Sequence, residues 1–245
     1  KIIKHHLYGF QNGSKKFSTG DWLKLASKKI YEIKNKKKIP ILVGGTGLYF
    51  KALTEGLVEI TAIPNKFRNK IRLLQKSIGQ EKFYKKLLKL DPSIINHIKS
   101  TDVQRSIRAY EVELFTKKSI TEWYKSTKSK FKKKEFLKLY IDYPRPKLIE
   151  KINLRVRQML DRGAVLEVKK FLKLKISKNK SVSKAIGVVE IKDLIEKKID
   201  EDEVIEKISI KTRQYAKRQA TWARGHMKSW KKIEPKRLNS FLKKI

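Results

Sequence analysis

A short apolar segment that runs directly into a glycine-rich turn is the feature that most constrains how this chain can fold. Residues 39–43 read Ile-Pro-Ile-Leu-Val, residues 44–47 read Gly-Gly-Thr-Gly, and the segment at 48–55, expected to be a helix that Gly56 closes, follows. A wholly apolar run of this length is typical of a buried parallel strand, and glycines allow a tight turn into a helix. The order of strand, glycine turn and helix therefore predicts an α/β fold with a parallel sheet.

The segments on either side extend this plan and interrupt it once. Ser18 and Asp21 have the spacing of a capping box, which predicts a helix from there to about residue 38. Apolar and β-rich residues at 136–142 and a shorter segment at 229–233 predict two further strands. The long stretch after the glycine unit shows helical patterns only. We therefore expect an incomplete α/β core formed by residues 1–57 and 135–245, and an all-helical insertion at 58–134.

Charge and composition narrow the classes of partner and of chemistry. The 245 residues include 62 Lys and Arg against 24 Asp and Glu, a formal net charge of +38. Such a surplus favours a polyanionic partner, because basic surfaces bind phosphates with release of counterions, although a lysine-rich genome would produce the same surplus. The chain has no Cys, which excludes disulfides and thiolate catalysis, and its four His lack a metal-ligand spacing. Its longest uncharged run has twelve residues, fewer than the roughly 18 that a membrane-spanning helix needs.

The glycine turn is a candidate anion site. Gly44, Gly45 and Thr46 would present backbone N–H groups and a hydroxyl at the start of a helix, where unpaired N–H groups and the helix dipole attract anions. A plain strand-to-helix turn is the alternative. The chain contains no GxxxxGK[ST] phosphate loop.

Arginines gather in a few segments of a chain whose basic residues are mostly lysines, which indicates a need for the planar guanidinium fork. Arg105 and Arg108 are expected one turn apart on a helix, beside Gln104, whose amide can read a base edge. Ion pairing between Arg108 and Glu111 is the structural alternative.

Two further segments are candidates for binding phosphate or nucleic acid. Arg155 is expected beside the apolar stripe of a helix, and a partly buried Arg usually has a carboxylate or phosphate partner. Glu167 is the structural alternative as that partner. Residues 212–224 form the densest basic cluster, in which Tyr215 and Trp222 supply stacking surface. This combination favours binding of an RNA backbone and unstacked bases over a merely solvated helix face.

Several segments occur together in a fixed order. They are His5-His6-Leu7, IPILVGGTGLYFKA at 39–52, EGL at 55–57, DVQRSIRAYEV at 102–112, RVRQML at 155–160 with Gly163 and Glu167-Val168, Ala185-Ile186-Gly187, and TRQYAKRQATW at 212–222. With them, nearly the whole chain resembles the bacterial tRNA dimethylallyltransferases, also called tRNA isopentenyltransferases. The resemblance implies a P-loop NTPase-like α/β core, a nucleotide-binding type of fold, that carries a helical insertion.

The resemblance also implies an activity. Members of this family transfer a dimethylallyl group from dimethylallyl diphosphate to N6 of the adenosine 3′ of the anticodon, with Mg²⁺, in tRNAs that read codons beginning with U. The implied partners are the tRNA anticodon stem-loop, bound by the helical insertion, and dimethylallyl diphosphate. Mg²⁺ would be bound mainly through the diphosphate and the family's phosphate-loop segment. A cytoplasmic, monomeric transferase without a membrane segment is the expectation that follows.

Site residues follow from the positions that match the family's motifs. The resemblance places Thr46 by the reacting centre, Arg155 facing the diphosphate, and Gly44 and Gly45 at a phosphate. The residues that correspond to the family's tRNA contacts are Arg68, Gln104, Arg105, Ser106, Ile107, Arg108, Lys184, Ala185, Ile186, Gly187, Lys217, Arg218, Gln219, Ala220, Thr221, Trp222, Ala223 and Arg224.

The chain departs from the family pattern in two places. Val188 and Val189 stand where the family tends to have Tyr-Arg or similar, which removes any contact that the Arg would make. The family's phosphate loop and the segment bearing its catalytic Asp precede the His-His-Leu segment, and here only four residues do. We therefore expect this chain, as a truncated form, to bind RNA weakly and to transfer nothing, while its gene encodes the active enzyme.

Two other functions stay open. An adenylate isopentenyltransferase would act on a free nucleotide, but such enzymes need neither the helical insertion nor the basic segment at 217–224. A non-catalytic RNA-binding protein that lacks the phosphate loop would have the same motifs, and the upstream reading frame would distinguish it from the enzyme. A basic DNA-binding protein is less favoured, because no helix-turn-helix, zinc finger or zipper is visible.

Overall fold

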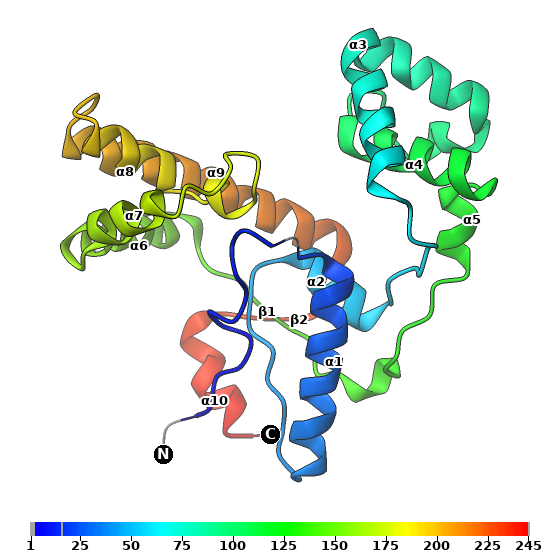
Figure 1. Cartoon of the computed structure of the whole chain (residues 1–245). Helices are drawn as coiled ribbons and strands as arrows, with labels where there is room; N and C mark the ends of the chain where they lie inside the picture. The colour runs from blue at the N-terminus through cyan, green and yellow to red at the C-terminus, as the bar shows by residue number, and fades with distance from the viewer. Residues whose placement is uncertain (1–2, 16, 245) are drawn as a thin grey trace. The chain divides into compact units, whose positions relative to one another are not determined.

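The computed structural model describes residues 3–15 and 17–244. The chain divides into two compact units, which Figure 1 shows as ribbons coloured along the chain. The discontinuous unit comprises Lys1–Phe50 and Lys134–Ile245, and the helical unit comprises Lys51–Lys133. Helix α2 (Gly47–Thr54) begins in the first and ends in the second.

The discontinuous unit begins with helix α1 (Thr19–Asn35), and its start confirms the capping box read from the sequence. The Ser18 hydroxyl accepts a hydrogen bond from the Asp21 backbone N–H at 3.1 Å, and the Asp21 carboxylate accepts one from the Ser18 N–H at 2.9 Å. The hydrogen bonds from Ser18 hold the pKa of the Asp21 carboxyl below its usual range. Leu23, Ala26 and Ile30 then repeat at helical spacing on the buried face.

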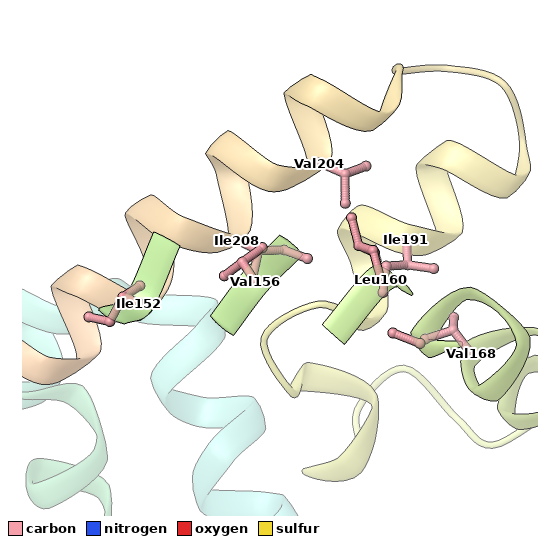
Figure 2. Close-up of a cluster of buried hydrophobic side chains, with 8 residues drawn as sticks. Ile152, Val156, Leu160, Val168, Ile191, Val204 and Ile208 are labelled. Atoms are coloured by element: carbon pink, nitrogen blue, oxygen red, sulfur yellow. The ribbon is translucent and has the colours of Figure 1, made fainter. Parts of the chain in front are cut away.

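Four helices of the same unit bury one shared apolar core. They are α6 (Arg145–Asp161), α7 (Ala164–Lys173), α8 (Val188–Ile195) and α9 (Glu201–His226). Figure 2 shows the core side chains gathered between these helices. The four-residue spacing within α6 and α9 puts their apolar side chains on one face of each helix. The buried residues of this core are Ile152, Val156, Leu160, Ala164, Val168, Ile191, Val204 and Ile208.

The sheet of the described chain has two short parallel strands. Strand β1 (Leu139–Ile141) pairs with β2 (Lys231–Ile233), with Leu139 opposite Lys231 and Ile141 opposite Ile233. Both strands fall within the segments that the sequence predicted as strands, and the predicted α/β class is confirmed in a helix-rich form.

The prediction of a third strand at 39–43 is wrong. These residues form neither helix nor strand, and the side chains of Ile39, Ile41 and Val43 are 81%, 77% and 82% exposed. A parallel strand is buried only when neighbouring strands take its backbone hydrogen bonds and helices cover both of its faces. Among residues 3–15 and 17–244, no strand runs beside this segment, so its apolar side chains stay in solvent.

The helical unit is built from α3 (Asn65–Leu90), α4 (Val103–Thr116) and α5 (Ile120–Lys125). Helix α3 is kinked at Gly79, which leaves the helical conformation, and its φ of 76° suits a residue without a Cβ. Asp91 caps a short 3₁₀ helix, η1 (Pro92–Asn96), with its side chain. Buried residues such as Phe83, Leu87 and Val112 form the core of this unit.

The remaining elements are short. They are the 3₁₀ turns η2 (Lys133–Glu135), η3 (Val182–Lys184) and η4 (Pro235–Arg237), and the final helix α10 (Leu238–Leu242). Every helix in the part of the chain that the structure describes is too short or too polar to cross a membrane.

Candidate functional site

The glycine turn leads into helix α2 as the sequence predicted. Helix α2 begins at Gly47, and the Thr46 carbonyl accepts the first hydrogen bond, from the Tyr49 N–H at 3.0 Å. Gly44, Gly45 and Thr46 are exposed. The turn therefore presents unpaired N–H groups of a helix start and the Thr46 hydroxyl to solvent, which is an arrangement that suits an anion.

The turn packs tightly against α9, the helix that carries the densest basic cluster. A Cβ added to Gly45 would lie 2.1 Å from Nε2 of Gln219, and one added to Gly47 would lie 2.2 Å from Cε3 of Trp222. Both distances are far below a van der Waals contact. The end of the Gln219 side chain is flexible and can move aside, whereas the Trp222 ring cannot do so as easily, so position 47 in particular needs glycine. The structure thus brings the glycine turn and residues 219–222 together within the discontinuous unit.

The ends of α9 explain why the sequence forms a helix there. Asp200 accepts a hydrogen bond from the Glu203 N–H at 2.8 Å and Glu203 accepts one from the Asp200 N–H at 3.2 Å, which completes a capping box. Acidic residues fill the first turn, while Arg224 and His226 lie in the last, so both ends favour the helix dipole. This capped helix holds the basic cluster in a fixed register.

The aromatic residues of α9 have two different surroundings. Trp222 is half-buried: besides the Gly47 contact, it stacks on His226 with ring centroids 4.4 Å apart and planes 6° from parallel. Tyr215 is exposed, and the guanidinium carbon of Arg218 lies 5.6 Å from the centre of its ring. Tyr215 and Arg218 together therefore offer a free stacking surface of the kind that binds unstacked bases.

The basic side chains of α9 are mostly open to solvent. Lys217, Arg218 and Arg224 are exposed, and Nη2 of Arg224 donates to the Thr221 hydroxyl at 3.1 Å. Lys211, on the flank of the cluster, forms an ion pair with Glu190 of α8 and so connects the two helices.

Glu190 also fixes the segment at 184–187. The Gly187 N–H donates to the Glu190 carboxylate at 2.9 Å, and the left-handed φ of Gly187, 101°, suits a residue without a Cβ. Burial raises the pKa of the Glu190 carboxyl, but the hydrogen bonds from Lys211 and from the Gly187 backbone outweigh it and hold the pKa below its usual range. Lys184, Ala185 and Ile186 remain exposed beside this anchor.

Arg155 differs from the expectation. It is exposed rather than partly buried, because Ile152 and Val156 take the core-facing positions of α6 and residue 155 points away from them. Within the described residues its guanidinium has no ion pair, and Glu167 is not its partner. The fork of Arg155 is therefore free to bind an anionic ligand.

In the helical unit, the segment at the start of α4 presents some predicted residues and buries others. Gln104 and Arg105 are exposed; the Asp102 carboxylate accepts from the Arg105 N–H at 3.0 Å and pairs with its guanidinium at 3.1 Å. The side chains of Ser106 and Ile107 are buried in the core. The structure therefore supports a packing role, and not an RNA contact, for the side chains of Ser106 and Ile107.

Glu111 is almost completely buried, and arginines surround it. The distance to its carboxylate is 3.2 Å from Nε of Arg68, 3.7 Å from Nη1 of Arg108 and 3.9 Å from Nε of Arg72. The pairing of Arg108 with Glu111, considered from the sequence as an alternative, is therefore present. Arg72 was not predicted as a site residue, although its place one turn after Arg68 was a usable signal.

Tyr124 of α5 was also missed. Its side chain is only partly covered. This partial burial raises the pKa of Tyr124, and the nearby charges of Arg108 and Arg105 oppose that rise. No pattern in the sequence indicates this proximity, because α4 and α5 meet only in the folded unit.

No metal site is built into the described residues. Across positions 3–15 and 17–244, no three His, Asp or Glu side chains come close enough to hold an ion. The donor set present does not fit a protein-built Mg²⁺ site.

Comparison with curated proteins gives relatives along the whole chain. The sequence pattern of the family described as IPP transferase matches residues 1–226. The chain is 60% identical over 245 residues to the tRNA dimethylallyltransferase of Pelagibacter ubique, covering 100% of this chain and 78% of that one. It is 39% identical over 235 residues to the tRNA dimethylallyltransferase of Agrobacterium fabrum, covering 95% and 79%.

Solved structures agree with these relatives. The tRNA isopentenylpyrophosphate transferase of Bacillus halodurans is similar with a TM-score of 0.62 and 28% identity, over 95% of this chain and 72% of that one. A eukaryotic dimethylallyltransferase described as acting on tRNA is similar with a TM-score of 0.72 and 28% identity, over 86% and 54%. The predicted resemblance and fold are thereby confirmed, and the chain belongs to the IPP transferase family.

Proposed function

We propose that this protein transfers a dimethylallyl group from dimethylallyl diphosphate to N6 of the adenosine 3′ of the anticodon, in tRNAs that read codons beginning with U. The observation that carries the proposal is the close approach of the exposed glycine turn to helix α9. It joins a turn suited to a diphosphate and a basic face suited to RNA in one compact unit. The 60% identity to an enzyme named tRNA dimethylallyltransferase supports the same reaction.

The exposed groups of the turn fit the chemical demand of this reaction. The exocyclic adenine nitrogen is a weak nucleophile, so catalysis has to orient it and stabilise the departing diphosphate. A bond forms between N6 and C1 of the dimethylallyl group, the bond between C1 and the diphosphate oxygen breaks with its electron pair on the diphosphate, and the proton of N6 passes to water. The Thr46 hydroxyl and the N–H groups of Gly44 and Gly45 would donate to phosphate oxygens. The free fork of Arg155 would bind them in a bidentate manner.

Mg²⁺ would bind through the oxygens of the diphosphate, since the described side chains form no cluster of metal ligands. When bound, it would neutralise part of the diphosphate charge.

The tRNA contacts would come from exposed residues of both units. Phosphates of the anticodon stem-loop suit the basic side chains of the helical unit and of α9. The target base has to leave its stack to react, and the exposed Tyr215 ring beside Arg218 offers it or a neighbouring base a stacking surface. We expect the protein to act as a monomer in the cytoplasm.

Nucleoside mass spectrometry tests the proposal directly. Unmodified tRNA would be incubated with dimethylallyl diphosphate, Mg²⁺ and either the 245-residue chain or an extended protein, in which the part of the Pelagibacter ubique relative that this chain does not cover is added. We expect a five-carbon addition to adenosine with the extended protein, and the 245-residue chain shows how much of the transfer its own residues support.

Two controls separate the other functions. The extended protein would also be offered AMP, and prenylation of AMP in preference to tRNA would indicate an adenylate isopentenyltransferase. RNA binding without any transfer, to tRNA or to AMP, would overturn the proposal and indicate a non-catalytic RNA-binding protein.

A further inference from the structure

A buried carboxylate in the helical unit calls for an explanation. Glu111 lies on α4 with 1% of its side chain exposed, and Oε1 has no hydrogen-bond partner within the described residues. Burying a charged group that is incompletely hydrogen-bonded costs free energy, and an apolar side chain of similar volume would often be more stable at such a position. Stability of the fold is therefore a weak reason for a glutamate here.

The groups around Glu111 point to a ligand. The helical unit contains four arginines among sixteen lysines, and three of the four, Arg68, Arg72 and Arg108, surround this one carboxylate. One arginine would neutralise it, so the cluster keeps an excess of two positive charges. The arginine side chains are 35%, 48% and 39% exposed, which leaves their outer edges in contact with solvent.

The geometry fixes these guanidinium groups only in part. Arg68 donates to Glu111 through Nε at 3.2 Å, whereas Arg72 and Arg108 lie at 3.9 and 3.7 Å, within ion-pair range but beyond a hydrogen bond. Each of these two therefore keeps its donors for another oxygen atom. A guanidinium fork matches the oxygens of a phosphate, which a lysine ammonium binds only as a point charge.

We propose that Glu111 is a positioning residue that holds Arg68, Arg72 and Arg108 as a binding site for a backbone phosphate of the RNA, with Arg72 as a further phosphate ligand. The inference rests on the proposed function, which makes tRNA the substrate. Pre-orienting the three side chains lowers the entropy cost of binding. The site accounts for the buried charge, the choice of arginine over lysine and the surplus of positive charge.

The variant Glu111→Gln separates positioning from simple charge, because the two predict opposite signs. Removing a negative charge near the phosphates should by itself strengthen RNA binding. If Glu111 positions the arginines, binding weakens instead: we expect the Kd of the 245-residue chain for an anticodon stem-loop RNA to rise by about three- to tenfold, as when one or two charge-assisted hydrogen bonds are loosened.

Glu81→Gln is the matched control, since Glu81 is an exposed acid on α3 of the same unit. Its Kd should be unchanged or slightly lower. If Glu111→Gln binds RNA as tightly as the wild type or more tightly, the inference is overturned.

Arg72 gives a test that does not depend on the fold tolerating a change at Glu111. Arg72→Lys keeps the charge and loses the fork, so we expect it to weaken binding nearly as much as Arg72→Ala. In Arg72→Ala, the slope of log K against log salt should also fall by about 0.7–0.9, the value for one phosphate contact. Lys70→Ala, on the other side of the same helix, removes one charge and should have a much smaller effect.

The outcomes distinguish this inference from the proposed function. Thermal unfolding of each variant would show whether the fold is kept. Equal losses for Arg72→Ala and Lys70→Ala would overturn the phosphate site even where the extended protein transfers the dimethylallyl group. Conversely, no transfer by the extended wild type would defeat the proposed function, while the paired RNA affinities would still decide the role of Glu111.

Discussion

Gly47 and Trp222 lie so close together that residue 47 has no room for a Cβ, which would come to 2.2 Å from Cε3 of the indole ring. The two residues are far apart in the sequence, and their contact joins the start of α2 to the middle of the basic segment of α9. The half-buried Trp222 is in turn held by stacking on His226. A substitution in the glycine turn therefore also displaces side chains of the basic helix α9.

A series of glycine-to-alanine variants should show a graded loss of activity. Gly47→Ala forces either the turn or a stacked ring to move, and we expect the transfer rate of the extended protein to fall more than tenfold, with a loss of about 1–3 kcal/mol in unfolding free energy from overpacking. Gly45→Ala should cost less, because the atoms it meets are the end of the flexible Gln219 side chain.

Gly44→Ala is the control for the close approach, since a Cβ there would meet nothing within 4 Å and alanine keeps the backbone N–H that would donate to a phosphate oxygen. Its transfer rate should stay within about twofold of the wild type, as for most exposed substitutions without a contact. Equal losses at all three positions would contradict the close approach to α9 as the cause. Rates would be measured by dimethylallyl incorporation into tRNA, and stability by denaturant unfolding.

Thr46 should matter for turnover and not for RNA binding. Its exposed hydroxyl lies at the start of α2, where it can donate to the leaving diphosphate. In the extended protein we expect Thr46→Ala to lower kcat by about 100-fold, the lower end of the range for losing one donor to a developing charge, with little change in the Kd for tRNA. Thr46→Ser keeps the hydroxyl and should retain most of the rate. Equal losses of kcat and tRNA affinity would make Thr46 a structural turn residue.

Arg155 should act on the diphosphate through its fork. Because its guanidinium is exposed and unpaired within the described residues, Arg155→Ala should leave the thermal unfolding midpoint almost unchanged. We expect kcat/KM for dimethylallyl diphosphate to fall by about 100-fold, and Arg155→Lys to recover only a small part of the loss. Arg157 is exposed on the same helix and provides the control. A comparable loss for Arg157→Ala would show that only the charge of α6 matters.

The Glu190–Lys211 pair should make stability depend on pH in the acidic range. The folded-state pKa of Glu190 lies below its ordinary value, so the pair's contribution is fully present above the unfolded pKa, about 4.3, and is lost as the pH falls through the folded one. Glu190→Gln should therefore lower the unfolding free energy at pH 7 by about 1–3 kcal/mol, and the difference from the wild type should shrink below about pH 4.

Glu196 at the end of the same helix is the comparison for this pH effect. It pairs with Lys192 and Lys198 on the surface, where ion pairs contribute little, so Glu196→Gln should leave the unfolding free energy nearly unchanged at pH 7. Urea unfolding at a series of pH values measures both variants. A Glu190→Gln deficit that persists unchanged at pH 3 would show that the loss comes from packing and not from the charge.

Features that depend on residues close together in the sequence could be predicted from it. The capping box at Ser18 and Asp21 formed as predicted, because its partners are three residues apart. The strand at 139–141 lies inside its predicted segment. The turn at 44–47 also leads into a helix as expected, since glycine and the following apolar residues determine it locally.

Features that depend on residues far apart in the sequence could not be predicted in this way. The strand expected at 39–43 needed partner strands that the described chain does not place beside it. The burial of Arg155 was misjudged because the rotation of α6 is fixed by its contacts with α7 and α9. The approach of Gly47 to Trp222, and that of Arg68 and Arg72 on α3 to Glu111 on α4, join helices whose packing no local pattern reveals.

The exposed segment at 39–43 has a consequence for how this chain behaves in solution. Its apolar side chains and unpaired backbone are a template for association with other chains. At low ionic strength the net charge of +38 keeps the molecules apart, but at about 0.15 M salt the repulsion extends only about 8 Å. A rise in salt concentration would thus weaken RNA binding and, at the same time, promote self-association of the chain. Colloidal stability, measured by light scattering at each salt concentration, therefore sets the range in which the RNA affinities of this chain are meaningful.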